Sequence, residues 1–272
     1  MQIIGLYLFI IGCCLGSFIN VITFRLPIGQ SIIYPRSRCP KCKAKIKWFD
    51  NIPFLSWFIL RGKCRACYNK ISIIYPLVEI SFGILIYLIL YSNPTIYEML
   101  PSHFSIFLGI IFYFILFTLA ILDFKYFWLP QFITLGGLCL GIFFALLIDL
   151  LFELKNFNFI IDSLTGAFVG YLSFYLLSYF GLKIYRKPVM GKGDIKLAAL
   201  LGSWLGTQGL FLSIWVAFLT AGFFVSMGLM LKKIKRNQKI PFGIFLAASG
   251  IMVWQFGNQF FVEIINLAFL EK

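Results

Sequence analysis

Long apolar segments that carry almost no charge constrain this chain more than any other feature. Eight of them follow one another, at about 2–24, 73–91, 104–122, 131–150, 160–181, 195–207, 209–231 and 242–268. A helix of about 20 residues crosses the roughly 30 Å hydrocarbon core of a bilayer, and lipid offers no hydrogen bonds to free backbone groups. We therefore expect an all-α polytopic membrane protein with about eight transmembrane helices. The segment 195–207 is short for a span, so it is tilted, shielded by its neighbours or merged with 209–231.

Basic residues predict how these helices are oriented. Residues 25–70 contain 11 Lys and Arg against one acid, and the links 182–196 and 232–239 contain five basic residues each. The alternate links, at 92–103, at 151–159 and around 208, contain Lys155 as their only basic residue. Excess Lys and Arg stays in the cytosol, so the basic links are predicted to be cytosolic and both termini to face out. The net charge of +14 is then mostly topogenic. It favours anionic lipids as partners and no nucleic acid.

The start of the chain, MQIIGLYLFIIGCC, lacks a basic region and a small-residue cleavage site. We therefore expect it to remain as the first span rather than to be removed as a signal peptide.

Two CxxC pairs, Cys39/Cys42 and Cys64/Cys67, lie in the most polar part of the chain. Each begins the pattern C-x-x-C-x-x-K-I, and 21 residues separate the pairs. Two such knuckles suit one tetrahedral zinc ion with four thiolate ligands, a closed site that stabilises a small domain. Disulfides or a redox relay are the alternatives, although a reducing cytosol disfavours stable disulfides. The predicted division is a first transmembrane helix at 1–24, a cytosolic zinc-binding loop domain at 25–72 and a transmembrane core at 73–272.

Two of the ten acids stand at the predicted cytosolic ends of spans. Asp123 ends a span in FTLAILDFKYFWLP, and Asp194 begins one in GKGDIKLAALLG. A helix N-terminus accounts for Asp194, but an acid at a helix C-terminus meets the wrong pole of the macrodipole. Two carboxylates brought to one depth share a proton. They suit an aspartic peptidase, and they equally suit a carrier that uses Asp123 and Asp194 as a proton or cation site.

The residues around Asp194 also fit a site. Gly191 and Gly193 leave room for a substrate backbone to approach the acid. Lys192 and Lys196 flank it, and we count Lys196 among the supporting residues.

The chain resembles the type IV prepilin peptidases, which are polytopic GxGD aspartic peptidases. The stretches that carry the resemblance are GSFINVITFRLP at 16–27, the two-knuckle loop running into ISIIYPLVE at 71–79, LDFKYFWLP at 122–130, GKGDIKLAALLGSWLG at 191–206 and PFGIFLA at 241–247. They occur in the family's order over nearly the whole chain. One departure is Gln131, which stands where the family usually has another aspartate.

The resemblance implies the activity and its residues. Asp123 and Asp194 are then the catalytic pair of an endopeptidase of the bacterial inner membrane. This enzyme removes the basic leader from prepilins or pseudopilins after a glycine, at the cytosolic face. Many relatives also methylate the new N-terminal residue with S-adenosylmethionine, and those with all four loop cysteines are typically bifunctional. Glu79 matches a family carboxylate with a methyl-transfer or structural role. The chain has no glycine-rich dinucleotide-type fingerprint, so methyl transfer rests on the resemblance alone.

Overall fold

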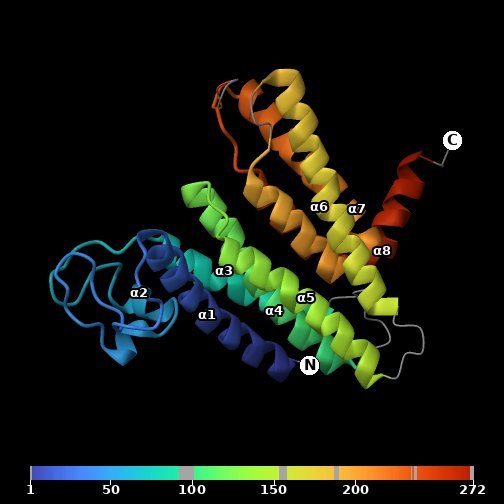
Figure 1. Cartoon of the computed structure of the whole chain (residues 1–272). Helices are drawn as coiled ribbons and strands as arrows, with labels where there is room; N and C mark the ends of the chain where they lie inside the picture. The colour runs from blue at the N-terminus through green and yellow to red at the C-terminus, as the bar shows by residue number, and fades with distance from the viewer. Residues whose placement is uncertain are drawn as a thin grey trace. The chain divides into compact units, whose positions relative to one another are not determined.

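The computed structural model describes residues 2–91, 101–152, 158–186, 190–233, 235 and 238–269. Within these ranges the ordered elements are helices, and no strand occurs among them (Figure 1). The helices are α1 (Gln2–Arg25), α2 (Leu55–Ile59), α3 (Ile74–Leu88), α4 (Ser102–Tyr126), α5 (Gln131–Leu151), α6 (Asn158–Tyr185), α7 (Lys192–Met230) and α8 (Phe242–Phe269). The all-α class expected from the sequence is confirmed.

Six helices are long and apolar enough to cross a membrane, namely α1, α3, α4, α5, α6 and α7. The expected spans 195–207 and 209–231 both fall within α7, which is 39 residues long and broken at Gly206 (φ 66°, ψ −174°). The two arms of α7 run in different directions from this glycine (Figure 1). In α8 a similar break at Gly257 leaves a shorter apolar helix, Phe242–Gly257. Much of the links 92–103 and 151–159, on which the predicted orientation depends, lies outside the described residues.

The chain forms two compact units, Met1–Leu90 and Tyr91–Lys272. In the first, α1 and α3 pack antiparallel through small residues. A Cβ atom on Gly12 would lie 2.8 Å from the Cα of Gly83, and one on Gly16 would lie 2.8 Å from the Cα of Glu79. Close backbone approach of this kind is how helices associate in lipid. The finer division into 1–24, 25–72 and 73–272 stays a prediction.

In the second unit, α6 and α7 approach each other in the same way. A Cβ atom on Gly170 would lie 2.5 Å from the carbonyl oxygen of Ala198. The Ser163 hydroxyl donates to the carbonyl of Ser203 at 2.8 Å. An aromatic cluster from α4, α5, α7 and α8 fills the core, with Phe112 5.1 Å from Trp204 and 5.2 Å from Trp254 between ring centroids.

Two acids of this unit stabilise helix starts. Asp149 accepts hydrogen bonds from the backbone N–H groups of Phe159 and Ile160, at 3.3 and 2.8 Å, at the beginning of α6. Asp162 accepts from the N–H and the hydroxyl of Thr207, at 3.0 and 2.7 Å, directly after the break in α7. Both carboxylates therefore satisfy N–H groups that have no partner within their own helix.

Candidate active site and metal centre

Asp123 and Asp194 come together in the second unit. Asp123 lies in the last turn of α4 and is 6% exposed. Asp194 is the third residue of α7 and lies within electrostatic range of Asp123. The 70 residues that separate the two acids contain all of α5 and α6, so only the tertiary fold brings them together.

The start of α7 holds the Asp194 carboxylate. The backbone N–H of Gly191, the N-cap residue, donates to Asp194 Oδ2 at 3.2 Å. This is one half of a capping box. A Cβ atom on Gly193 would lie 2.8 Å from the Cβ of Leu129, so this glycine also allows α7 to approach the segment after α4.

The Asp123 carboxylate faces the start of α8. Its Oδ2 atom is buried and makes no hydrogen bond, although the backbone N–H groups of Gly243 and Ile244 lie beside the carboxylate. A Cβ atom on Gly243 would lie 2.7 Å from Asp123 Oδ2 and 3.2 Å from Leu129 Cδ1. The N-terminus of α8 thus offsets the unfavourable pole that Asp123 meets at the end of its own helix.

Sequence reasoning missed Gly243 and Leu129 as parts of this site. Both lie within stretches that carry the family resemblance, PFGIFLA and LDFKYFWLP. Phe127 adopts a left-handed conformation (φ 52°), and its N–H donates to the carbonyl of Asp123 at 2.9 Å. This turn ends α4 and directs Leu129 back toward the acids.

The other two predicted supporting residues are Lys196, which lies in the same helix as Asp194, and Glu79, which belongs to the other unit. Lys196 is half-buried in the second turn of α7. The one ion pair found among the described residues joins Arg65 to Asp50. Lys196 therefore forms no ion pair with Asp123 or Asp194. Glu79 belongs to the first unit, where it is 8% exposed and accepts the backbone N–H of Phe54 at 2.6 Å.

The four loop cysteines form a cluster that could hold a metal. The Sγ atoms of Cys39, Cys42, Cys64 and Cys67 all lie within 4.8 Å of one another. Those of Cys39 and Cys67 are 3.8 Å apart, which is about the edge of a tetrahedron with zinc–sulfur bonds of about 2.3 Å. A disulfide needs about 2.05 Å, and the seven cysteines are free. The donor set and its spacing fit one closed metal site.

Both knuckles have the same backbone geometry. In the first, Lys43 N–H donates to the carbonyl of Cys39 at 3.0 Å, and in the second Tyr68 N–H donates to that of Cys64 at 2.9 Å. Lys43 and Tyr68 both have positive φ, at 59° and 57°. The repeated sequence pattern therefore produces a repeated turn. Asn69 Nδ2 donates to Cys67 Sγ at 3.3 Å and lowers the pKa of that thiol to about 6, which favours the thiolate that binds metals.

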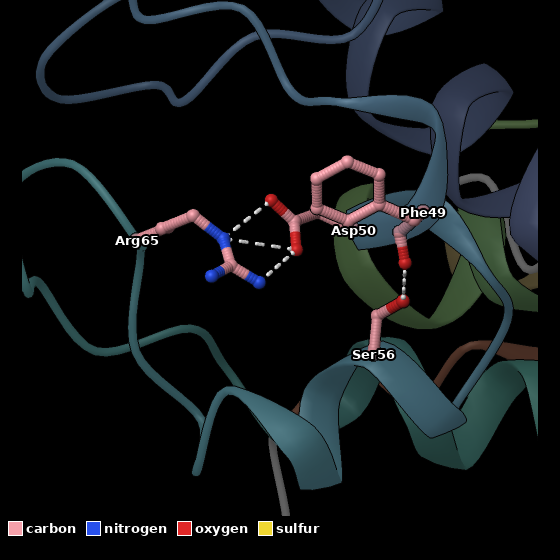
Figure 2. Close-up of polar contacts among 4 residues, drawn as sticks. All are labelled: Phe49, Asp50, Ser56 and Arg65. Carbon is pink, nitrogen blue, oxygen red and sulfur yellow. Dashed lines mark hydrogen bonds and ion pairs between the residues drawn. The ribbon is translucent and has the colours of Figure 1, made fainter.

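An ion pair links the second knuckle to the segment between the knuckles. Arg65 Nη2 lies 2.7 Å from Asp50 Oδ1, and Arg65 Nε donates to Asp50 Oδ2 at 2.9 Å (Figure 2). The guanidinium lowers the pKa of Asp50 from its ordinary value. In the same view, the Ser56 hydroxyl donates to the carbonyl of Phe49 at 3.0 Å. Asp50 therefore belongs to the scaffold of the loop.

Two family profiles match the chain. Residues 10–93 match the Bacterial Peptidase A24 N-terminal domain, and residues 110–226 match the Type IV leader peptidase family. The chain belongs to the type IV leader peptidase family. The first profile contains the four cysteines and Glu79, and the second contains both aspartates of the pair.

Named relatives agree with this membership. The chain is 39% identical over 206 residues to the prepilin leader peptidase/N-methyltransferase of Myxococcus xanthus, and the match covers 76% of this chain and 57% of that protein. It is 31% identical over 284 residues to the protein of the same name from Stutzerimonas stutzeri, covering 95% and 93%. With that of Aeromonas hydrophila it is 32% identical over 277 residues, covering 92% and 90%. No solved structure matches the chain.

Proposed function

We propose that this member of the type IV leader peptidase family is a prepilin leader peptidase of the bacterial inner membrane, with Asp123 and Asp194 as its catalytic pair. The observation that carries the proposal is the meeting of two carboxylates from distant parts of the chain inside the matched peptidase domain. The other acids described in that unit, Asp149 and Asp162, are occupied in capping helices. Asp123 Oδ2, in contrast, is buried with no hydrogen-bond partner.

The pair would act as general base and general acid. Two adjacent carboxylates share one proton. The ionised member takes a proton from a water molecule, which attacks the scissile carbonyl carbon. The protonated member then gives its proton to the leaving amide nitrogen as the carbon–nitrogen bond breaks. In this scheme Gly191 fixes Asp194 through its N–H, and the start of α8 orients Asp123.

The substrate follows from the relatives' names and from the predicted orientation. A prepilin or pseudopilin would place its apolar segment in the bilayer and its basic leader in the cytosol. The scissile bond then lies at the depth of the two aspartates, on the cytosolic side of the bilayer. Anionic lipids around the basic links would lower the repulsion between these links and the leader.

We also propose the second activity that the relatives' names contain. S-adenosylmethionine would supply a methyl group to the new N-terminal amine. Zinc would bind the four loop cysteines and hold the two knuckles together. With four thiolate ligands it would leave no open position for water and serve as a structural ion.

The test is cleavage of a model prepilin by the purified protein in detergent. We expect cleavage by the wild type and none by Asp123→Asn or Asp194→Asn, because neither amide can exchange a proton as a carboxylate does. Asp162→Asn is the matched control, since Asn caps a helix about as well as Asp. Labelled S-adenosylmethionine in the same assay should label the cleaved product.

Strong residual cleavage by either Asp123→Asn or Asp194→Asn would remove that residue from the pair. A wild-type protein that leaves the leader attached, and that transports protons or cations, would instead support the carrier alternative.

A further inference from the structure

The segment between the two knuckles lies alongside the helices α1 and α3 of the first unit, and not only beyond their ends. Glu79, which accepts the Phe54 N–H, lies five residues after Ile74, the first residue of α3, and this is about 8 Å along the helix at about 1.5 Å per residue. The Phe54 ring packs edge-on against Phe9, with centroids 6.1 Å apart. Phe9 stands sixteen residues before the end of α1 at Arg25. Since α1 and α3 are both candidate membrane spans, Phe54 lies beside the part of the chain that would cross the membrane.

The second half of this segment has its backbone N–H groups satisfied from within the protein, as lipid requires. The N–H groups of residues 54 to 58 and of residue 60 all have acceptors, namely Glu79 for Phe54 and backbone carbonyls for the rest. Residue 53 is a proline and has no N–H to satisfy. Among residues 54 to 58 and residue 60, the Phe54 N–H is the one accepted by a side chain, that of Glu79.

The side chains of the segment suit a bilayer interface. Its exposed apolar residues are Trp48, Phe49, Ile52, Leu55, Phe58 and Ile59, of which Trp48 is 82% and Ile59 71% exposed. Basic residues stand at both ends, at Lys47, Arg61 and Lys63. An apolar surface between basic flanks is typical of an interfacial element in an anionic membrane.

We propose that residues 48–60 form a re-entrant segment whose partner is the lipid bilayer. Its apolar side chains contact acyl chains, its basic flanks contact anionic headgroups, and Glu79 holds it at this depth through Phe54. Two observations favour lipid as the occupant. The segment packs against the candidate span α1 through the Phe9–Phe54 contact, and its charges complement anionic lipid. This proposal goes beyond the peptidase activity and does not depend on it.

Tryptophan quenching locates the segment. The full chain is placed in nanodiscs of phosphatidylcholine and phosphatidylglycerol, with or without bromine on the acyl chains. The emission of Trp48 is taken as the difference between the wild type and Trp48→Phe. We expect brominated acyl chains to quench most of this emission and iodide in the buffer to quench little of it. Tyr68→Trp in the Trp48→Phe background is the control, because Tyr68 is 75% exposed at the tip of the second knuckle. Its emission should respond to iodide and not to bromine.

A second pair of variants tests Glu79. Glu79→Gln keeps a carbonyl acceptor for the Phe54 N–H, whereas Glu79→Leu removes it at similar volume. We expect Trp48 to remain protected from iodide in Glu79→Gln and to become accessible in Glu79→Leu. Wild-type Trp48 emission that iodide quenches and brominated lipid does not would overturn the re-entrant placement. Equal protection in Glu79→Leu and the wild type would overturn the role of Glu79.

Discussion

Replacement of Gly243 by alanine tests the geometry of the proposed active site most directly. The new Cβ atom would lie 2.7 Å from Asp123 Oδ2, and ordinary contact begins at 3.4 Å. The carboxylate must therefore move by at least 0.7 Å, the difference between these distances. A side-chain carboxylate can rotate away, so we expect the protein to fold and to melt near the wild-type temperature. Asp123 would then be misplaced relative to Asp194.

A displacement of this size predicts a large loss of rate. Misplacement by about 1 Å can cost on the order of 100-fold in catalysis, which corresponds to about 2.7 kcal/mol in the activation barrier. We expect kcat for a model prepilin to fall by about this factor with little change in KM, because in the proposed scheme the substrate's apolar segment lies in the bilayer, away from Gly243.

Steady-state cleavage in detergent measures the effect of Gly243→Ala, and thermal unfolding checks the fold. Gly222→Ala is the matched control, since a Cβ atom at this helical glycine meets nothing within 4 Å. A Gly243→Ala enzyme with wild-type kcat would refute the placement of α8 against Asp123. A Gly222→Ala enzyme that loses equal activity would show that any added methyl group is harmful.

Two further predictions concern the metal site and the helix packing. Cys64→Ser should lower the zinc content of the purified protein from about one ion per chain to near zero, since three thiolates and a hydroxyl bind zinc weakly. Mass spectrometry of the metal measures the zinc content. The control variant Cys139→Ser, in α5, should keep the ion. Gly170→Ala should destabilise the protein by about 1–3 kcal/mol through overpacking against the Ala198 carbonyl. Thermal unfolding measures the change in stability. The control variant Gly136→Ala, where a Cβ atom meets nothing within 4 Å, should leave the stability unchanged.

The helices and the cysteine cluster were predictable because their signals are local. Apolar length predicts a span without knowledge of its neighbours, and the repeated pattern at Cys39 and Cys64 predicts two similar turns. The structure confirms the all-α class and the gathering of the four sulfur atoms. It also has a break at Gly206, where the sequence predicted a connection near residue 208 between two spans. That the bound ion is zinc stays a prediction.

The contacts of the site were less predictable because they are tertiary. The acids suggested that Asp123 and Asp194 share a depth, but depth alone does not make two helices neighbours. Gly243 has no side chain to signal a role, and its importance appears only from the atom a Cβ would meet. The bond between Glu79 and Phe54 joins residues 25 positions apart, through a loop whose path the sequence pattern does not determine.

The break in α7 limits how far Asp194 can lie from the opposite side of the membrane. The arm from Lys192 to Leu205 has 14 residues, which at about 1.5 Å each gives about 21 Å. This falls short of the roughly 30 Å hydrocarbon core. One end of the arm must therefore stop inside the apolar layer, and tilting the arm only increases the shortfall. If Asp162 and Thr207 lie at the outer surface of the hydrocarbon core, the length of the arm places Asp194 about 9 Å inside the inner surface of that core. A substrate bond would then have to leave the cytosol to be cut.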